Sequence, residues 1–170
     1  MKSNASLIFF SVLLAAIATV AQAGHYYTTN RAQRDKAVST QGYQVQGIAG
    51  YVFNKPSPSK RPSTGPIYHA YSSYSKDQAY TNSLDEQNHA ISLGYQDMGI
   101  AWYMYTKPSD CRAPLYILFK PSFPYDHYYT ASRTEADNAV ANGYLERGIL
   151  GYLYTNSNNT ASPLYQLYKP

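Results

Sequence analysis

Histidine is the residue type of this chain best suited to acid–base or metal chemistry, and the sequence contains four. They are His25, His69, His89 and His127. Only His25 and His127 occupy corresponding places in the repeated pattern of the chain, and no triplet has the spacing of a metal site. We therefore expect the histidines to hydrogen-bond within the scaffold, and we expect no metal and no cofactor.

Cys111 is the single cysteine of the chain and stands in the segment Ser-Asp-Cys-Arg. A catalytic thiol needs a base that orients it, and the sequence nominates none. A single cysteine also excludes an intramolecular disulfide framework. We expect an exposed loop thiol that is able to form an intermolecular disulfide, and hence a dimer through Cys111.

The acidic residues do not form a convincing catalytic pair. Glu135 completes a capping box that begins at Ser132, and Asp137 is expected on an exposed helix face. The Gly-x-Ser-x-Gly elbow, the phosphate-binding loop and the His-Glu-x-x-His motif are all absent from the sequence. We predict that the protein is not an enzyme.

Tyrosine is unusually frequent, at 20 of 170 residues. Tyrosines that recur in every repeat are expected in the core, where a ring fills space and its hydroxyl reaches a hydrogen-bond partner. These are Tyr27, Tyr80, Tyr129, Tyr43, Tyr95, Tyr144, Tyr51, Tyr103, Tyr152, Tyr68, Tyr116 and Tyr165.

Aromatic residues outside the recurring set are better candidates for a ligand surface. Trp102 stands where the other repeats have Gly50 and Gly151, and we expect its indole to project toward a ligand. Tyr26 and Tyr128 neighbour a core tyrosine on a strand, so the alternation of a strand turns them to the opposite face. Aromatic faces beside polar groups are suited to stacking on sugar rings. The predicted ligand-binding residues are Trp102, Tyr26, Tyr128, His25, His127 and Asp126.

Charge argues against several partner classes. The chain has 14 Lys and Arg against 10 Asp and Glu, a formal charge of +4, and only 14% charged residues. Nucleic-acid-binding surfaces need clustered basic residues, and the longest basic cluster here is Lys60-Arg61. A hydrophobic content of 44% excludes a disordered charged tail. We expect no nucleic-acid partner.

After residue 23 the chain consists of three similar repeats. The segment His25-Tyr-Tyr-Thr28 recurs as His127-Tyr-Tyr-Thr130 and, more weakly, as Gln78-Ala-Tyr-Thr81. Each copy is followed by a polar stretch, a glycine and a tyrosine, and then by a Gly-Ile pair. An aromatic segment, 67–71 or 115–119, precedes the second and third copies, whereas the counterpart for the first copy is 164–168.

This arrangement predicts three repeats permuted around the ends of the chain. We assign the first repeat to 24–66 plus 164–170, the second to 67–114 and the third to 115–163. The terminal strand 164–168 is expected to pair with the segment around 25–28. Such pairing would close a ring and leave no free sheet edge.

Within each repeat we expect the order strand–strand–helix–strand. Capping signals at Ser83, Ser132 and, more weakly, Asn30 predict helices over about 31–41, 84–93 and 133–142. Gly42, Gly94 and Gly143 follow these helices and suit the left-handed position there. The predicted fold is therefore an α+β, three-fold pseudo-symmetric closed ring. The alternative is a β-trefoil, a fold that has no helices.

Residues 1–23 are typical of a cleaved signal peptide. Lys2 precedes an apolar run from Leu7 to Val20, and Ala21-Gln-Ala23 fits a signal-peptidase site. The run is short for a membrane span. We expect one secreted domain over 24–170, without membrane attachment after cleavage and with Asn158 as a glycosylation acceptor.

The combination of Leu164-Tyr-x-Leu-Tyr168, His127-Tyr-Tyr-Thr130, a capped helix and Gly143-Tyr-x3-Gly-Ile149 resembles a Tyr-rich tandem-repeat family of largely unknown function. Members occur as accessory modules of secreted cell-wall hydrolases, peptidases and lipases, and as small secreted fungal proteins. The resemblance implies a binding or targeting role. The middle repeat departs from the pattern at Gln78-Ala79, which puts a site there in doubt.

Two functional hypotheses follow. The first is a secreted, lectin-like protein that binds a polysaccharide or glycoconjugate through repeated weak sites. The alternative is a structural or protein-interaction protein such as a hydrolase inhibitor, whose contacts would lie in the long loop 54–66.

Overall fold

The computed structural model of the chain describes residues 24–57, 63–157 and 160–170. The predicted signal peptide 1–23 and the predicted glycosylation acceptor Asn158 lie outside these residues. Within them the fold is α+β. In chain order its elements are β1 (Gly24–Thr28), α1 (Arg31–Gln41), β2 (Gln44–Val52), β3 (Thr64–Tyr71), β4 (Gln78–Thr81), α2 (Leu84–Ser92), β5 (Gln96–Tyr105), β6 (Ala113–Lys120), β7 (Asp126–Thr130), α3 (Arg133–Ala141), β8 (Leu145–Leu153) and β9 (Ser162–Lys169).

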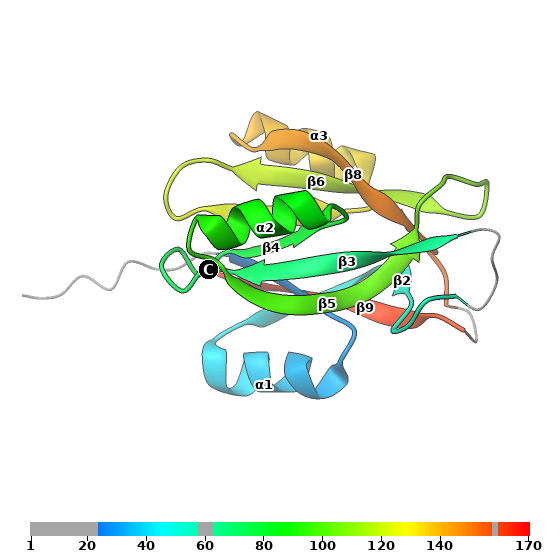
Figure 1. Cartoon of the computed structure of the whole chain (residues 1–170), viewed down its shortest axis with the longest axis horizontal. Helices are drawn as coiled ribbons and strands as arrows, with labels where there is room; N and C mark the ends of the chain where they lie inside the picture. Colours follow the sequence, from blue (N-terminus) through cyan, green and yellow to red (C-terminus); the bar gives the residue numbers. More distant parts are fainter. Residues whose placement is uncertain (1–23, 58–62, 158–159) are drawn as a thin grey trace, which may run out of the picture.

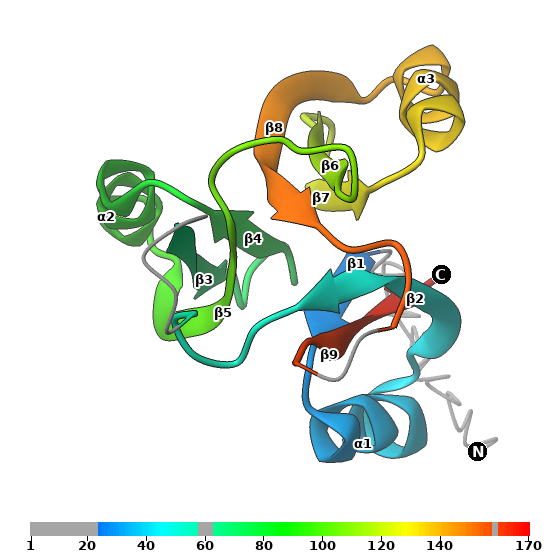
Figure 2. The same cartoon turned by 90° about the vertical axis from the view of Figure 1, so that its right-hand side faces the viewer.

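These elements form three groups around a common centre, and the helices lie on the outside (Figure 1, Figure 2). Group 1 contains α1 and the strand order β1-β9-β2. Groups 2 and 3 contain α2 and α3, and their strands form one six-stranded sheet of order β4-β3-β5-β8-β6-β7, in which group 2 contributes β4-β3-β5 and group 3 contributes β8-β6-β7. The helices are absent from a β-trefoil, so the alternative fold does not describe this chain.

Strand β9 is the central strand of the group 1 sheet and joins segments from opposite parts of the sequence. It pairs antiparallel with β1, where Tyr26 lies opposite Leu167, and on its other side with β2. The expected pairing of 164–168 with 25–28 is therefore present. Strands β3, β6 and β9 begin at Thr64, Ala113 and Ser162, a few residues before the predicted repeat boundaries at 67, 115 and 164.

Side-chain caps explain where the helices begin. The Asn30 side chain accepts hydrogen bonds from the backbone N–H groups of Ala32 and Gln33, and Ser83 and Ser132 each accept one from the glutamate three residues on. The predicted helix ranges agree with the observed ones to within one residue. The predicted left-handed glycines are confirmed, since Gly42, Gly94 and Gly143 have φ of 79°, 93° and 91°.

Three tyrosines at the centre tie the groups together through a cyclic set of hydrogen bonds. The hydroxyl of Tyr27 donates to the backbone oxygen of Tyr129 and accepts from its backbone N–H. Tyr129 makes the same pair of bonds with the backbone of Tyr80, and Tyr80 makes it with that of Tyr27. The three rings are edge-on to one another, with centroids 5.4–5.9 Å apart. Each ring thus satisfies the buried backbone of another group.

A second cyclic contact lies at the ends of β2, β5 and β8. Backbone bridges join Phe53 to Tyr103, Tyr105 to Tyr152, and Tyr154 to Tyr51. The side chains of Phe53, Tyr105 and Tyr154 stack edge-on there, and the hydroxyls of Tyr105 and Tyr154 are 2.9 Å apart. Each pair of groups is therefore joined twice, once at the centre and once at these strand ends.

The expectation that all recurring tyrosines are core residues is only partly correct. Tyr27, Tyr80, Tyr129 and Tyr43 are buried, whereas the other members of the recurring set are half-buried. The aliphatic residues that alternate with them on the strands fill the core instead. These include Ile67, Leu115, Leu164, Leu118, Leu167, Val52, Met104 and Leu153.

Deletion of residues 163–170 should abolish cooperative unfolding. The deletion removes the strand that separates β1 from β2, together with Leu164 and Leu167, both 0% exposed. Circular dichroism during heating measures this. Removal of Pro170 alone, which follows β9, should leave the melting temperature unchanged. A 163–170 deletion that melts like the full chain would contradict the expectation.

Replacement of Tyr80 by Phe should cost roughly 2–4 kcal/mol of unfolding free energy, because it leaves the buried N–H and C=O of Tyr27 without their partner. Urea unfolding measures the change. Tyr74→Phe is the control, since Tyr74 is 77% exposed and its change should stay within about 0.5 kcal/mol. Equal stabilities of the two variants would show that the cyclic bonds contribute nothing.

Candidate functional site

Buried aspartates connect neighbouring groups at two of their three contacts. Asp126 of group 3 accepts hydrogen bonds from the backbone N–H of His25 at 2.8 Å and from the Tyr144 hydroxyl at 2.6 Å, and His25 Nδ1 lies 2.7 Å from its second oxygen. Burial would raise the pKa of Asp126, but the hydrogen bonds from His25 and Tyr144 outweigh it and lower the pKa. We call this arrangement the Asp–His bridge.

The contact between groups 2 and 3 repeats the Asp–His bridge. Asp77 accepts from the backbone N–H of His127 at 2.9 Å and from the Tyr95 hydroxyl at 2.8 Å, and its second oxygen is 2.7 Å from His127 Nδ1. The sequence analysis identified both histidines and Asp126 but missed Asp77. The signal was present, because Asp77 and Asp126 occupy the same place before Gln78 and His127.

The contact between groups 1 and 2 has no Asp–His bridge. Gly24 stands at the place of the aspartate and Gln78 at the place of the histidine. Tyr43, the counterpart of Tyr95 and Tyr144, lies beside Gln78 instead, and burial raises its pKa to about 12. One of the three contacts therefore lacks a carboxylate where the other two have one.

Two clefts lie beside these contacts. Cleft B, between groups 3 and 1, has a volume of about 420 Å³ and is lined by His25, Gln46, Tyr128, Glu135, Tyr144, Gln166 and Tyr168. Cleft A, between groups 1 and 2, has a volume of about 500 Å³ and is lined by Tyr26, Thr40, Gln41, Tyr43, His69, Tyr71, Lys76, Gln78, Met98 and Lys169.

The two clefts are built from corresponding residues. Tyr26, Tyr43 and Tyr71 of cleft A occupy the places in the sequence pattern that Tyr128, Tyr144 and Tyr168 occupy in cleft B. His69 likewise corresponds to Gln166, and Gln78 to His25. Each cleft thus combines three tyrosine rings with amide and imidazole groups, which donate and accept hydrogen bonds.

The rings of cleft B are held in place by their neighbours. The imidazole of His25 lies between Tyr128 and Tyr168, with centroid distances of 4.5 and 4.8 Å. The Tyr128 hydroxyl donates to Glu135 at 2.9 Å, and burial, together with this carboxylate, raises the pKa of Tyr128 to about 12. The Tyr128 ring therefore presents a fixed, uncharged face at neutral pH.

The structure brings together only part of the predicted site. His25 and Tyr128 line cleft B, with Asp126 buried behind His25, and Tyr26 lines cleft A. His127 lines neither cleft and stacks on Phe119 at 4.6 Å.

Trp102 contradicts the prediction that it projects toward a ligand. It is 2% exposed, lies in the main core cluster and packs on Tyr80 at 4.7 Å. The reason is the size of the neighbouring group's side chain. A Cβ at Gly50 would meet Leu153 at 2.4 Å, and one at Gly151 would meet Met104 at 3.0 Å.

The residue that corresponds to Leu153 and Met104 in group 1 is Val52, which is smaller. Both Val52 and Trp102 belong to the main core cluster. We infer that the shorter side chain leaves the room that the indole occupies, so that Trp102 fills the core where the other groups use a leucine or methionine.

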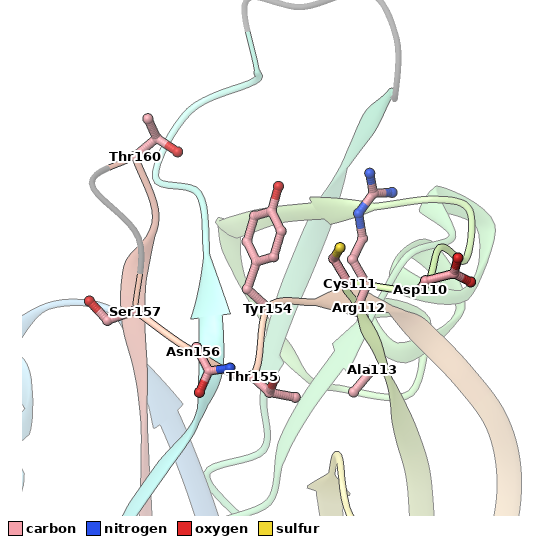
Figure 3. Close-up of a pocket in the computed structure, with 9 residues that line it drawn as sticks. All are labelled: Asp110, Cys111, Arg112, Ala113, Tyr154, Thr155, Asn156, Ser157 and Thr160. Atoms are coloured by element: carbon pink, nitrogen blue, oxygen red, sulfur yellow. The ribbon is translucent and has the colours of Figure 1, made fainter.

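A further cavity, of about 740 Å³, lies between the loop that carries Cys111 and the segment after β8 (Figure 3). Cys111 is exposed, as expected. Figure 3 shows Tyr154 and Arg112 extending toward the same side of the cavity, and the Arg112 guanidinium stacks on Tyr105 at 3.5 Å. The residues described around this cavity include the carboxylate of Asp110 but no histidine.

Searches for two other kinds of site gave negative results. Among residues 24–57, 63–157 and 160–170, no three His, Cys, Asp or Glu side chains are placed to share a metal ion. The helices in the same ranges are too short and too polar to cross a membrane.

Stability should depend on the protonation of His69. Its burial in cleft A lowers its pKa from 6.5 to about 4. Between these values the unfolded chain binds a proton and the folded chain does not, so stability is lost as the pH falls from 6.5 to 4.

Wild-type protein should lose unfolding free energy between pH 7 and pH 4.5. Replacement of His69 by Gln, the residue at the corresponding position 166, should reduce this loss by on the order of 2–3 kcal/mol. Urea unfolding at pH 7 and pH 4.5 measures it. His89→Gln, on the exposed face of α2, is the control. The same pH dependence in wild type and His69→Gln would contradict a buried neutral imidazole.

Comparison with known proteins identifies one family. Residues 17–154 and 122–170 match a family model described as a domain of unknown function (DUF5648). No curated protein and no solved structure matches the chain. The match spans the described fold and both clefts, so the chain belongs to the DUF5648 family.

Proposed function

We propose that this protein is a secreted, non-catalytic carbohydrate-binding protein whose three groups form one pseudo-threefold ring. The observation that carries the proposal is the pair of corresponding clefts, each with three tyrosine rings beside amide and imidazole groups. Sugars present apolar C–H faces and hydroxyl edges, and this combination of side chains is complementary to both.

The ring arrangement is supported by the cyclic contacts. The central tyrosines and the bridges at the ends of β2, β5 and β8 each connect the three groups cyclically. Clefts between such groups are spaced around the molecule, so one polysaccharide chain or two neighbouring chains could occupy both. Linked weak sites gain affinity through their effective concentration.

Secretion is supported by the sequence of residues 1–23, and a targeting role by the resemblance to modules attached to secreted hydrolases. A binding role is favoured over catalysis because glycoside hydrolysis ordinarily uses a pair of carboxylates, and the described lining of cleft B contains one, Glu135. Each cleft should bind a short saccharide with a Kd near 1 mM, or about −4 kcal/mol. The alternative of a hydrolase inhibitor depends on the loop 54–66, of which 58–62 lie outside the described residues.

Replacement of Tyr168 and Tyr71 by Ala should weaken polysaccharide binding at least about tenfold, because each change removes one ring from one cleft. Binding is measured by pull-down on insoluble chitin, β-glucan and peptidoglycan and on a glycan array. The melting temperature checks that the variants fold.

Tyr74→Ala is the matched control. Tyr74 is more exposed than Tyr71 and Tyr168 and lines neither cleft. If the protein adsorbed nonspecifically through exposed tyrosines, binding would fall in Tyr74→Ala and not in the cleft variants. Wild-type protein that captures none of these polymers, or a folded double variant that binds as wild type does, would overturn the proposal.

A further inference from the structure

We propose that cleft A binds the carboxylate of an acidic sugar, in the place where the other two contacts hold an aspartate. The ligand class is a uronic-acid-containing saccharide. This inference rests on the proposed carbohydrate-binding function and adds a ligand class for one of the two clefts.

The other two contacts show what the place accepts. At each of them an aspartate carboxylate accepts hydrogen bonds from a backbone N–H and a tyrosine hydroxyl, and it lies beside a histidine ring nitrogen, at distances of 2.6–2.9 Å. These partners come from two neighbouring groups. At the contact beside cleft A the tyrosine is retained as Tyr43, but the carboxylate is lost with Gly24. The fold therefore keeps part of a carboxylate site without its internal carboxylate.

Space is also available at this position. A Cβ built on Gly24 would have only ordinary contacts, at 3.7 Å from the backbone oxygen of Lys76 and 3.8 Å from Asp126 Oδ1. The position therefore accommodates a Cβ, with the Asp126 carboxylate of the neighbouring Asp–His bridge close by. The amide of Gln78 replaces the histidine and is able to donate to such a group, and it is held by His69 Nε2 at 2.7 Å.

The charge of cleft A also favours a carboxylate ligand, whereas the charge of cleft B does not. Lys76 and Lys169 line cleft A, and none of its described lining residues is acidic. Neither lysine forms a salt bridge with another described residue. Cleft B contains Glu135 and no lysine or arginine among its lining residues. An anionic ligand is therefore attracted to cleft A and not to cleft B.

Two further features make the lysines the source of this charge. His69 is neutral at physiological pH, because its burial lowers its pKa to about 4. Lys76 has a φ of 59°, in the left-handed region that lysine rarely adopts. The structure holds its backbone there, and the residue lines the cleft.

The test uses oligogalacturonate and its methyl ester, in which a methyl group removes the charge of each carboxyl group. Isothermal titration calorimetry on the wild-type protein should give at least about tenfold tighter binding of the acid than of the ester. A Lys76→Asn/Lys169→Gln variant should reduce the affinity for the acid to that for the ester. Asn keeps the left-handed backbone at 76 accessible.

Lys120→Gln is the matched control. Lys120 occupies the place in group 3 that Lys169 occupies in group 1, but it does not line cleft A. This variant should bind oligogalacturonate as wild type does. Equal affinity for acid and ester, or an equal loss in Lys120→Gln, would overturn the proposal.

A second variant restores the internal carboxylate. Gly24→Asp/Gln78→His should rebuild the Asp–His bridge, keep or raise the melting temperature, and lose the preference for the acid over the ester. Retention of that preference in a folded double variant would contradict the assigned place. Poly-L-glutamate is a further probe. If it binds as tightly as oligogalacturonate does, cleft A belongs to a general polyanion-binding surface, and the proposed sugar site is wrong.

Cleft B distinguishes failure of this inference from failure of the proposed function. If the protein binds a neutral polysaccharide, and Tyr168→Ala weakens that binding, but oligogalacturonate and its methyl ester bind equally, the inference alone fails. If neither neutral nor acidic saccharides bind, both fail.

Discussion

The cyclic exchange of hydrogen bonds among Tyr27, Tyr80 and Tyr129 is the constraint on which the fold depends. Each hydroxyl satisfies both the N–H and the C=O of a residue in another group, in a region from which water is excluded. A small three-stranded sheet with one helix is marginal alone. Since removing any one group leaves another group's backbone unsatisfied, the three groups are stable only together.

A fixed centre allows the outer contacts to vary. Trp102 of group 2 is larger than its counterparts Gly50 and Gly151, and Val52 of group 1 is smaller than its counterparts Leu153 and Met104. The volume of the core side chains thus differs between the groups, while the strands that carry them stay the same. The replacement of an Asp–His bridge by Gly24 and Gln78 removes one contact while two remain. Redundant contacts of this kind let one contact change, because the central tyrosines still hold the groups in register.

Local features of the fold could be predicted from the sequence, whereas the site required the structure. Capping residues and terminal glycines act within a few positions, so the helices were predicted to within one residue. Cleft lining depends on side chains from two groups, and the repeat pattern does not say which group lies against which. Trp102 was misjudged for the same reason, since its burial is decided by residues of another group. Tyr26 and Tyr128 line the clefts and are half-buried, whereas their strand neighbours Tyr27 and Tyr129 are buried, as strand alternation predicts.

The central position of β9 in the group 1 sheet has a consequence for how the chain folds. During synthesis β1 and β2 emerge early, but the strand that must lie between them follows groups 2 and 3 in the sequence. The strands of group 1 therefore keep unpaired edges until then, whereas the elements of groups 2 and 3 are each contiguous in the sequence. This long-range pairing raises the contact order and slows the final step. Until β9 arrives, the exposed edges of β1 and β2 are open to strands of other molecules, so aggregation and strand exchange compete with folding in this interval.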